Sequence, residues 1–348
     1  MINKWGYGII TQNYFRYFKH ILLQGEFELN ISILGTGALG IALANVLSKN
    51  GHTILMWTKF EEEKKKLDDK RENEITLPGV KIADGINITN NLREICDFSN
   101  IIVNVLPFVA VENTAKELSG ILEDSYIICS TTKGMDMQTF ETSTQIFERI
   151  CGVKKVCALS GPSFAIEIAN DEAICLELGG KNNDTTKLVK EIFENDSINI
   201  EITEDVIGVQ LCGAVKNAIA IGSGMLHGMK AADSTQAAYL ARGIKDMTKI
   251  IECLGGNKET VYTYAGIGDL ILTCMSEKSR NFSCGKLLGQ GKSLDETTEI
   301  LSGKTVEGIR VIEALYNYTQ KKHLRLDIIP KLYDIVFNSG NIEGIKKM

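Results

Sequence analysis

The regular part of the chain opens with an apolar segment, a glycine-rich turn and an amphipathic stretch. Residues 29–34 are largely apolar and predict a buried strand, and residues 53–57 predict the next one. Between them, apolar side chains recur at the spacing of one helical face, at Leu39, Ala42, Leu43, Val46 and Leu47. Gly51 is placed to end that helix. The pattern therefore predicts a strand–helix–strand unit.

Strand and helix patterns keep alternating along the next hundred residues. Strands are predicted at 101–105, 126–130 and 156–159, and helices near 110–119 and 137–150. The charge-dense run 61–71 predicts a solvated helix. Such alternation indicates a doubly wound parallel sheet, in which ligands bind beyond the carboxyl ends of the strands.

The pattern changes after about residue 203. Residues 206–229 are apolar and rich in small residues, but Gln210, Lys216 and Asn217 lie near the middle. These polar groups favour a helix buried in protein over a membrane span. Because no clear strand pattern follows up to residue 348, we expect three parts: an extension (1–28), an α/β sheet domain (29–204) and an all-helical domain (205–348).

Composition narrows the class of protein. The 348 residues are 44% hydrophobic and 24% charged, which is ordinary for a globular chain. A net charge of −6 gives no general attraction to nucleic acid or anionic lipid. Nine cysteines without a Cys-x-x-Cys pair, and four scattered histidines, predict no metal site and suit a reducing compartment such as the cytoplasm.

The segment 1–28 is rich in aromatic residues but lacks the apolar run of a signal peptide. It fits either a loosely ordered extension outside the fold or an arm for a partner or a membrane surface.

The turn after the first strand has the spacing Gly-x-Gly-x-x-Gly at residues 35–40. In a strand–turn–helix context Gly35 permits the tight turn, Gly37 lets a pyrophosphate approach the backbone, and Gly40 lets helix and strand pack closely. This predicts a dinucleotide-binding domain of Rossmann type. Lys59, where NAD-only enzymes tend to place a carboxylate, either meets a ribose phosphate, which would admit NADPH, or is a plain surface lysine.

Three further segments carry candidate chemistry. Lys216 lies in the predicted buried helix, where desolvation lowers the pKa of a lysine, so it is either a proton donor facing a cleft or a lysine reaching the surface. Asp269 lies beside a glycine-rich turn, with Thr273 four residues later. Residues 279–281 (Ser-Arg-Asn) offer a hydroxyl, a guanidinium and an amide, a set suited to a phosphate.

Seven motifs in order carry a resemblance to a known family. They are Gly-x-Gly-x-x-Gly at 35–40, Thr-Lys-Gly at 132–134, Ser-Gly-Pro-Ser-Phe-Ala at 160–165, Gly-Val-Gln-Leu-x-Gly-Ala-Val-Lys-Asn at 208–217, Gly-Ile-Gly-Asp-Leu at 266–270, Ser-Arg-Asn at 279–281 and Val-Glu-Gly at 306–308. From about residue 29 nearly to its end, the chain resembles NAD(P)-dependent glycerol-3-phosphate dehydrogenase of the bacterial type.

The resemblance implies reversible reduction of dihydroxyacetone phosphate to sn-glycerol 3-phosphate with NADH or NADPH, which supplies the backbone of glycerophospholipids. It implies catalytic roles for Lys216, Lys133 and Asp269. On the substrate side it implies Lys133, Gly161, Ser163, Lys216, Asn217, Asp269, Thr273, Ser279, Arg280 and Asn281. On the cofactor side it implies Gly35, Gly37, Ala38, Leu39, Gly40, Lys59, Lys133, Ala165, Arg280, Thr305 and Glu307. A homodimer without nucleic acid or an integral membrane segment is also expected.

Three alternatives stay open at this point. A related helical-domain dehydrogenase could act on a β-hydroxyacid or on ketopantoate. A non-catalytic dinucleotide sensor could use the same sheet domain, although it would not need Lys133, Lys216 and Asp269 together. A structural role at a membrane has only the aromatic segment 1–28 in its favour.

Overall fold

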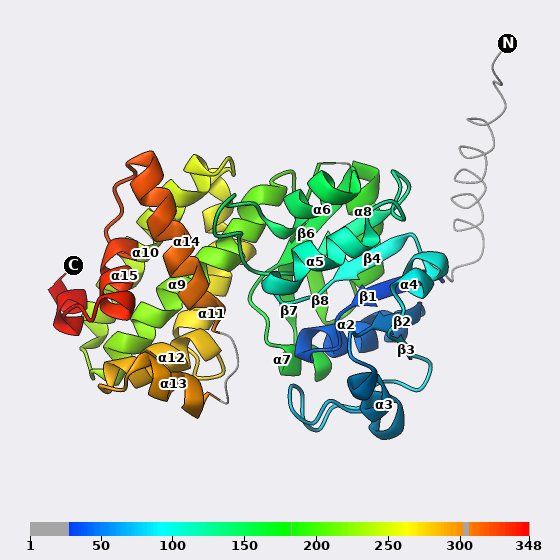
Figure 1. Ribbon diagram of the computed structural model, residues 1–348, viewed down its shortest axis with the longest axis horizontal. Coiled ribbons are helices and arrows are strands. Elements are labelled where there is room, and N and C mark those ends of the chain that lie inside the picture. Colours follow the sequence, from blue (N-terminus) through cyan, green and yellow to red (C-terminus); the bar gives the residue numbers. More distant parts are fainter. Residues whose placement is uncertain (1–27, 182, 302–305, 348) are drawn as a thin grey trace, which may run out of the picture.

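The computed structural model describes residues 28–181, 183–301 and 306–347. The predicted extension 1–28 therefore lies almost wholly outside the described residues. Two parts lie side by side, a sheet with helices on both faces and a group of packed helices (Figure 1).

The first part alternates strands and helices. Its elements are β1 (Asn30–Leu34), α2 (Ala38–Lys49), β2 (Thr53–Trp57), α3 (Glu61–Lys70), β3 (Asn87–Thr89), α4 (Leu92–Phe98), β4 (Ile101–Asn104), α5 (Phe108–Leu118), β5 (Ile127–Ser130), α6 (Ser143–Cys151), β6 (Lys155–Ser160), α7 (Ala165–Ala169), β7 (Ile174–Gly180), α8 (Asn183–Phe193) and β8 (Ile198–Thr203).

The eight strands form one sheet in the order β3-β2-β1-β4-β5-β6-β7-β8. Alternate side chains of β1, β2, β4, β5 and β6 enter two separate apolar cores. In β1, Ile31 and Ile33 pack with α2 and α8, whereas Leu34 packs with α4, α5 and α6. The predicted Rossmann-type sheet with helices on both faces is confirmed. The order turns at β1 and β4, the switch point where ligands of such sheets bind.

The sheet differs from the prediction in two ways. The pair β6–β7 is antiparallel, whereas the sheet was expected to be parallel throughout. Three strands were not predicted: β3 has only three residues, β7 ends in two glycines, and β8 is a half-exposed edge strand. Short, glycine-containing and edge strands all lack the apolar run that marks a central strand.

The predicted helix 137–150 was wrong at its start. Helix α6 begins at Ser143, because Thr142 and Gln145 form a capping box in which the Thr142 N–H donates to Gln145 Oε1 at 2.8 Å. The preceding residues form a turn held by Asp136, whose carboxylate accepts from the backbone N–H groups of Gln138 and Thr139 at 2.8 and 2.7 Å.

The second part contains helices and no strand among the residues described from 206 onward. Its elements are α9 (Val206–Gly228), α10 (Asp233–Cys253), the 3₁₀ helix η1 (Lys258–Tyr262), the π-helix η2 (Tyr264–Gly268), α11 (Asp269–Cys274), α12 (Arg280–Gly289), α13 (Leu294–Ile300), α14 (Glu307–Lys322), α15 (Ile329–Phe337) and the 3₁₀ helix η3 (Ile342–Lys347).

Helix α9 is the centre of this part and packs against α10, α11, α12 and α14 (Figure 1). It is long and apolar enough to cross a membrane, but its most apolar window is 94% buried inside the protein. The prediction of a buried helix is therefore confirmed. Glycines let its neighbour approach: a Cβ on Gly285 of α12 would lie well inside contact distance of the Ile221 carbonyl of α9.

Candidate active site

A buried cluster of two lysines and one aspartate joins the two parts of the chain. Lys216 Nζ of α9 lies 2.5 Å from Asp269 Oδ1 and 2.7 Å from Thr273 Oγ1. Lys133 Nζ, from the segment after β5, lies 2.7 Å from Asp269 Oδ2. The side chain of Asp269 is 1% exposed and that of Lys216 7%, while that of Lys133 is 21% exposed.

The charges of this cluster depend on one another. Burial lowers the pKa of Lys216 to about 7; the carboxylate of Asp269 opposes this shift and the charge of Lys133 adds to it. Burial alone would raise the pKa of Asp269, but the two ammonium groups outweigh it and lower that pKa. Lys216 can therefore give up a proton near neutral pH while Asp269 stays ionised. It does not reach the surface, the alternative that the sequence left open.

Local structure brings these three side chains together. Lys133 lies three residues after the end of β5, so it lies at the carboxyl edge of the sheet. Asp269 is the first residue of α11 and follows the π-helix η2, a form common at functional sites. On α9, a Cβ at Gly213 would lie 3.1 Å from Lys133 Cγ, so the absence of a side chain there leaves room for the lysine stem.

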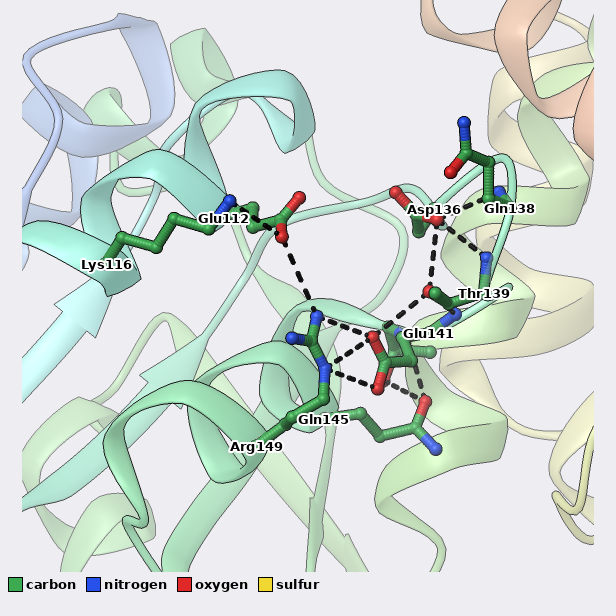
Figure 2. A network of polar contacts seen from close by, with 9 residues as sticks. Glu112, Lys116, Asp136, Gln138, Thr139, Glu141, Gln145 and Arg149 are labelled. Atoms are coloured by element: carbon green, nitrogen blue, oxygen red, sulfur yellow. Dashed lines mark hydrogen bonds and ion pairs between the residues drawn. The ribbon is translucent and has the colours of Figure 1, made fainter. Parts of the chain in front are cut away.

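The segment after Lys133 is held from the outside by a second set of polar contacts (Figure 2). Thr139 Oγ1 donates to Asp136 and Glu141 at 3.0 and 3.1 Å, and Arg149 Nε of α6 donates to both carboxylate oxygens of Glu141 at 2.9 and 3.0 Å. On the other side Phe140 meets the ring of Tyr318 of α14 edge-on at 4.9 Å. The segment therefore bridges the sheet and the helical part.

The start of α12 and the start of α14 border the cluster. Ser279 caps α12 through its hydroxyl, which accepts from the Phe282 N–H at 3.3 Å, and Arg280 next to it is exposed. Asn281 Oδ1 accepts from the Gly308 N–H at 2.9 Å. Burial raises the pKa of Glu307, while the charges of Arg280, Lys133 and Lys216 act to lower it.

The remaining substrate-side candidates lie on the same border. Gly161 follows β6, and Ser163 Oγ donates to the Gly161 carbonyl at 3.4 Å. Pro162 between them lies against the backbone of Gly268, the residue before Asp269. Asn217 follows Lys216 on α9 and is buried.

The glycine turn has the features of a diphosphate cradle. Gly35 has φ +119°, and a Cβ there would lie 3.1 Å from the Val105 carbonyl; a Cβ at Gly40 would collide with the Gly35 carbonyl. A Cβ at Gly37 would meet nothing within 4 Å, so that position faces open space. Helix α2 starts there without a side-chain cap or an acidic residue, which leaves its first N–H groups for an anion. The residues present therefore fit a dinucleotide.

Other cofactor-side candidates are placed less directly. Ala38 and Leu39 are in the first turn of α2, and Ala165 begins α7, which packs against α2. Lys59 is 57% exposed and its Nζ lies 3.1 Å from Glu117 Oε1 of α5. The candidate Thr305 lies outside the described residues.

Comparison with known proteins decides the family. A family model described as NAD-dependent glycerol-3-phosphate dehydrogenase N-terminus matches residues 30–186, and the corresponding C-terminus model matches residues 205–347. The chain belongs to the NAD-dependent glycerol-3-phosphate dehydrogenase family. The resemblance found in the seven motifs is thereby confirmed, and with it an oxidoreductase that uses NAD or NADP.

Individual members of the glycerol-3-phosphate dehydrogenase family agree. A protein named glycerol-3-phosphate dehydrogenase (NAD(P)+) from Fusobacterium nucleatum is 36% identical over 313 residues, which cover 89% of this chain and 93% of the relative. One of the same name from Staphylococcus haemolyticus is 33% identical over 320 residues, 91% of this chain and 96% of the relative. The crystal structure of glycerol-3-phosphate dehydrogenase from Coxiella burnetii matches with a TM-score of 0.87 and 26% identity, over 91% of this chain and 97% of that one.

A ketopantoate reductase structure from Ralstonia eutropha shares the fold with a TM-score of 0.55 and 11% identity, over 92% of this chain and all of that one. The fold alone therefore does not separate the two classes of dehydrogenase that the sequence left open; the family match does. Relatives of this family reduce dihydroxyacetone phosphate to glycerol 3-phosphate.

Sequence reasoning missed one group of polar residues at this site. Gln210 of α9, Ser143 and Thr144 of α6, and Ser130 and Asn104 at two strand ends are all buried and hydrogen-bonded to one another. Only Gln210 gave a signal in the sequence, as a polar residue in an apolar helix. The other four are ordinary strand-end and helix-start residues until the fold places them together.

Proposed function

We propose that Lys216, Lys133 and Asp269 form the catalytic centre for the reversible reduction of dihydroxyacetone phosphate to sn-glycerol 3-phosphate. The observation that carries this proposal is the buried Lys216, whose ammonium group is held by Asp269 and whose pKa is lowered to about 7. A general acid is most effective when its pKa lies near the working pH. A dinucleotide sensor would have no use for a proton donor of this kind.

Each member of the cluster has a part in the reaction. Lys216 donates a hydrogen bond to the substrate carbonyl and then a proton to the oxygen, where negative charge develops. Asp269 holds the ammonium groups in place, and Lys133 adds a second positive charge. Thr273 fixes Lys216 from the other side at 2.7 Å. The bound nicotinamide supplies the hydride. In the reverse direction neutral Lys216 accepts the hydroxyl proton.

The substrate phosphate is assigned to Arg280 and Asn281, at the start of α12. An exposed guanidinium beside a helix N-terminus suits a dianionic phosphate through paired, charge-assisted hydrogen bonds. Ser279, Gly161, Ser163, Asn217 and Thr273 are assigned to the rest of the polar wall around the substrate, and Lys133, Lys216 and Asp269 contact its reacting end.

The dinucleotide is assigned to the glycine turn and to α14. Gly35, Gly37 and Gly40 with the N–H groups of Ala38 and Leu39 would hold the diphosphate. Ala165, Glu307, Arg280, Lys133 and Thr305 are assigned to the remainder of the cofactor site, and Lys59 to the ribose of the adenosine. NADPH acceptance depends on Lys59 leaving Glu117 for the ribose phosphate.

Partners and location follow from the same reasoning. A net charge of −6 disfavours nucleic acid as a partner. We assign the enzyme to the cytoplasm, where free cysteines persist, to the supply of glycerophospholipid backbones, and to a homodimer in solution.

The test is a substrate comparison. Purified protein is mixed with NADH or NADPH, and oxidation is followed with dihydroxyacetone phosphate, dihydroxyacetone or ketopantoate. Rapid oxidation with the phosphorylated ketone alone supports the proposal. A preference for ketopantoate, or equal rates with dihydroxyacetone phosphate and dihydroxyacetone, contradicts it.

A further inference from the structure

Gln210 connects the helix of Lys216 to the sheet. It lies on α9 six residues before Lys216 and is 3% exposed. Its Oε1 accepts from Ser143 Oγ at 2.9 Å and from the Thr144 N–H at 3.1 Å, and its Nε2 donates to Thr144 Oγ1 at 2.7 Å and to the Val206 carbonyl at 3.1 Å. The carboxamide is thus fully used, and three of its four bonds reach the first turn of α6.

The hydrogen bonds continue from α6 through the sheet. Ser143 Oγ lies 2.5 Å from Ser130 Oγ at the end of β5, and Asn104 Nδ2 at the end of β4 donates to Ser130 Oγ at 3.1 Å. Asn104 Nδ2 also donates to Thr132 Oγ1 at 3.0 Å. Thr132 directly precedes Lys133. A continuous buried network therefore runs from α9 to the residue next to the second catalytic lysine.

The network bears on how the two parts of the chain are positioned relative to each other at the lysine–aspartate cluster. Lys133 comes from the sheet part, whereas Lys216 and Asp269 come from the helical part, so their contacts depend on how the two parts are registered. Lys133 is the most exposed of the three and its long side chain has the most freedom to lose. A fully satisfied polar network in a low-dielectric interior specifies one arrangement, because each alternative leaves a buried group without a partner.

Resting on the catalytic roles proposed above, we propose that Gln210 is a positioning residue that keeps Lys133 in contact with Asp269 and beside Lys216. It touches neither substrate nor cofactor and acts through Ser143, Ser130, Asn104 and Thr132. Its loss moves the charge of Lys133 away from Lys216 and leaves the fold of each part in place.

The readout is the protonation of Lys216. The groups that set it are Asp269 of α11, which raises its pKa, and Lys133, which lowers it. Lys216 in turn acts to lower the pKa of Glu307 of α14 and that of the Cys274 thiol of α11. Displacement of Lys133 therefore raises the pKa of Lys216, whereas a general loss of stability does not change it.

The experiment uses the full chain with ¹³C-labelled lysine, titrated by NMR. The Lys216 signal is assigned as the one missing in Lys216→Met. In Gln210→Met, which keeps the side-chain length without its polar groups, we expect the Lys216 titration to move up by half a pH unit or more. We also expect kcat for dihydroxyacetone phosphate to fall about tenfold, with KM for NADH within twofold. The matched control is Tyr239→Phe, which removes another buried hydrogen bond to α9, the 2.9 Å bond to the Ile219 carbonyl.

Ser143→Ala removes the hydroxyl that joins Gln210 to Ser130 and leaves Gln210 itself unchanged. This variant tests the proposal if Gln210→Met does not fold. A shift of the Lys216 titration in either network variant, absent in Tyr239→Phe, supports the proposal. A Lys216 titration that stays unchanged in every network variant that folds overturns it. Because NMR reads the lysine without substrate, a protein inactive on dihydroxyacetone phosphate would contradict the proposed function and leave this readout intact.

Discussion

The Nζ atom of Lys216 lies 2.5 Å from Oδ1 of Asp269, and this contact joins two residues 53 positions apart in the chain. Both side chains are buried, and neither charge would be stable there alone. Lys133 binds the other carboxylate oxygen, so the cluster holds two cations and one anion. In the mechanism proposed above, this excess positive charge faces the carbonyl oxygen that becomes an alkoxide.

The pH dependence of ketone reduction follows from this excess charge. Lys216 must be protonated to act as the acid, and its pKa in the free protein is lowered to about 7. We therefore expect kcat/KM for dihydroxyacetone phosphate to fall as the pH rises through about 7. The measurement is a pH profile of NADH oxidation between pH 5.5 and 9.5, in buffers of constant ionic strength.

Lys133→Met tests the same relationship from the other side. The charge of Lys133 lowers the pKa of Lys216. Its removal should therefore move the pH at which kcat/KM falls to a higher value, while reducing the maximal rate. Lys154→Met, at an exposed ion pair with Asp124, is the control and should leave the profile unchanged. Ionisation of the free substrate affects the wild type and both variants alike. If kcat/KM of Lys133→Met falls at the same pH as that of the wild type, Lys216 is not the titrating group.

Arg280→Leu tests the assignment of the phosphate. The change removes a charge-assisted contact, which should cost roughly 1.5–3 kcal/mol of binding. KM for dihydroxyacetone phosphate should rise strongly, and the rate with dihydroxyacetone should improve relative to it. Arg93→Leu, on the exposed surface of α4, is the matched control. If the rates with dihydroxyacetone phosphate and with dihydroxyacetone fall by the same factor in Arg280→Leu, the guanidinium serves the cofactor or the fold.

Lys59→Glu tests the choice between NADPH and NADH. Like charges should repel the ribose phosphate of NADPH, and because Lys59 is largely exposed the preference should change by only about 1 kcal/mol, and by less at high salt. Glu117→Gln frees Lys59 from its ion pair and should shift the preference the opposite way. The ratio of kcat/KM for the two cofactors at two ionic strengths measures both. A ratio that neither variant changes would place Lys59 in solvent and selectivity elsewhere.

Much of this architecture could be predicted because local signals carried it. The Gly35–Gly40 spacing required a tight turn, an open position and a close helix–strand contact, and the structure has all three. Lys216 in an apolar helix required a buried partner. Its partner Asp269 was suggested only by the family resemblance. Asp269 does not follow a predicted strand, and its contact with Lys133 spans 136 positions of the chain, so no local pattern places the two together.

Other features had no local signal. The antiparallel pair β6–β7 is set by how the chain returns across the sheet. The start of α6 is an exception, because Thr142 and Gln145 have the sequence spacing of a capping box. Asn104, Ser130 and Ser143 are unremarkable in sequence, and their hydrogen bonds exist only because parallel strands end side by side. The ion pair of Lys59 with Glu117 likewise depends on where β2 ends relative to α5.

The measurement that tests the central claim most directly is turnover of dihydroxyacetone phosphate by Lys216→Met. Methionine keeps the apolar helix, so the variant should fold, bind NADH and melt near the wild-type temperature. Without the proton donor and its charge, kcat should fall on the order of a hundredfold or more. Lys154→Met should retain wild-type turnover. Near-normal turnover by folded Lys216→Met would contradict the role of Lys216 as the acid.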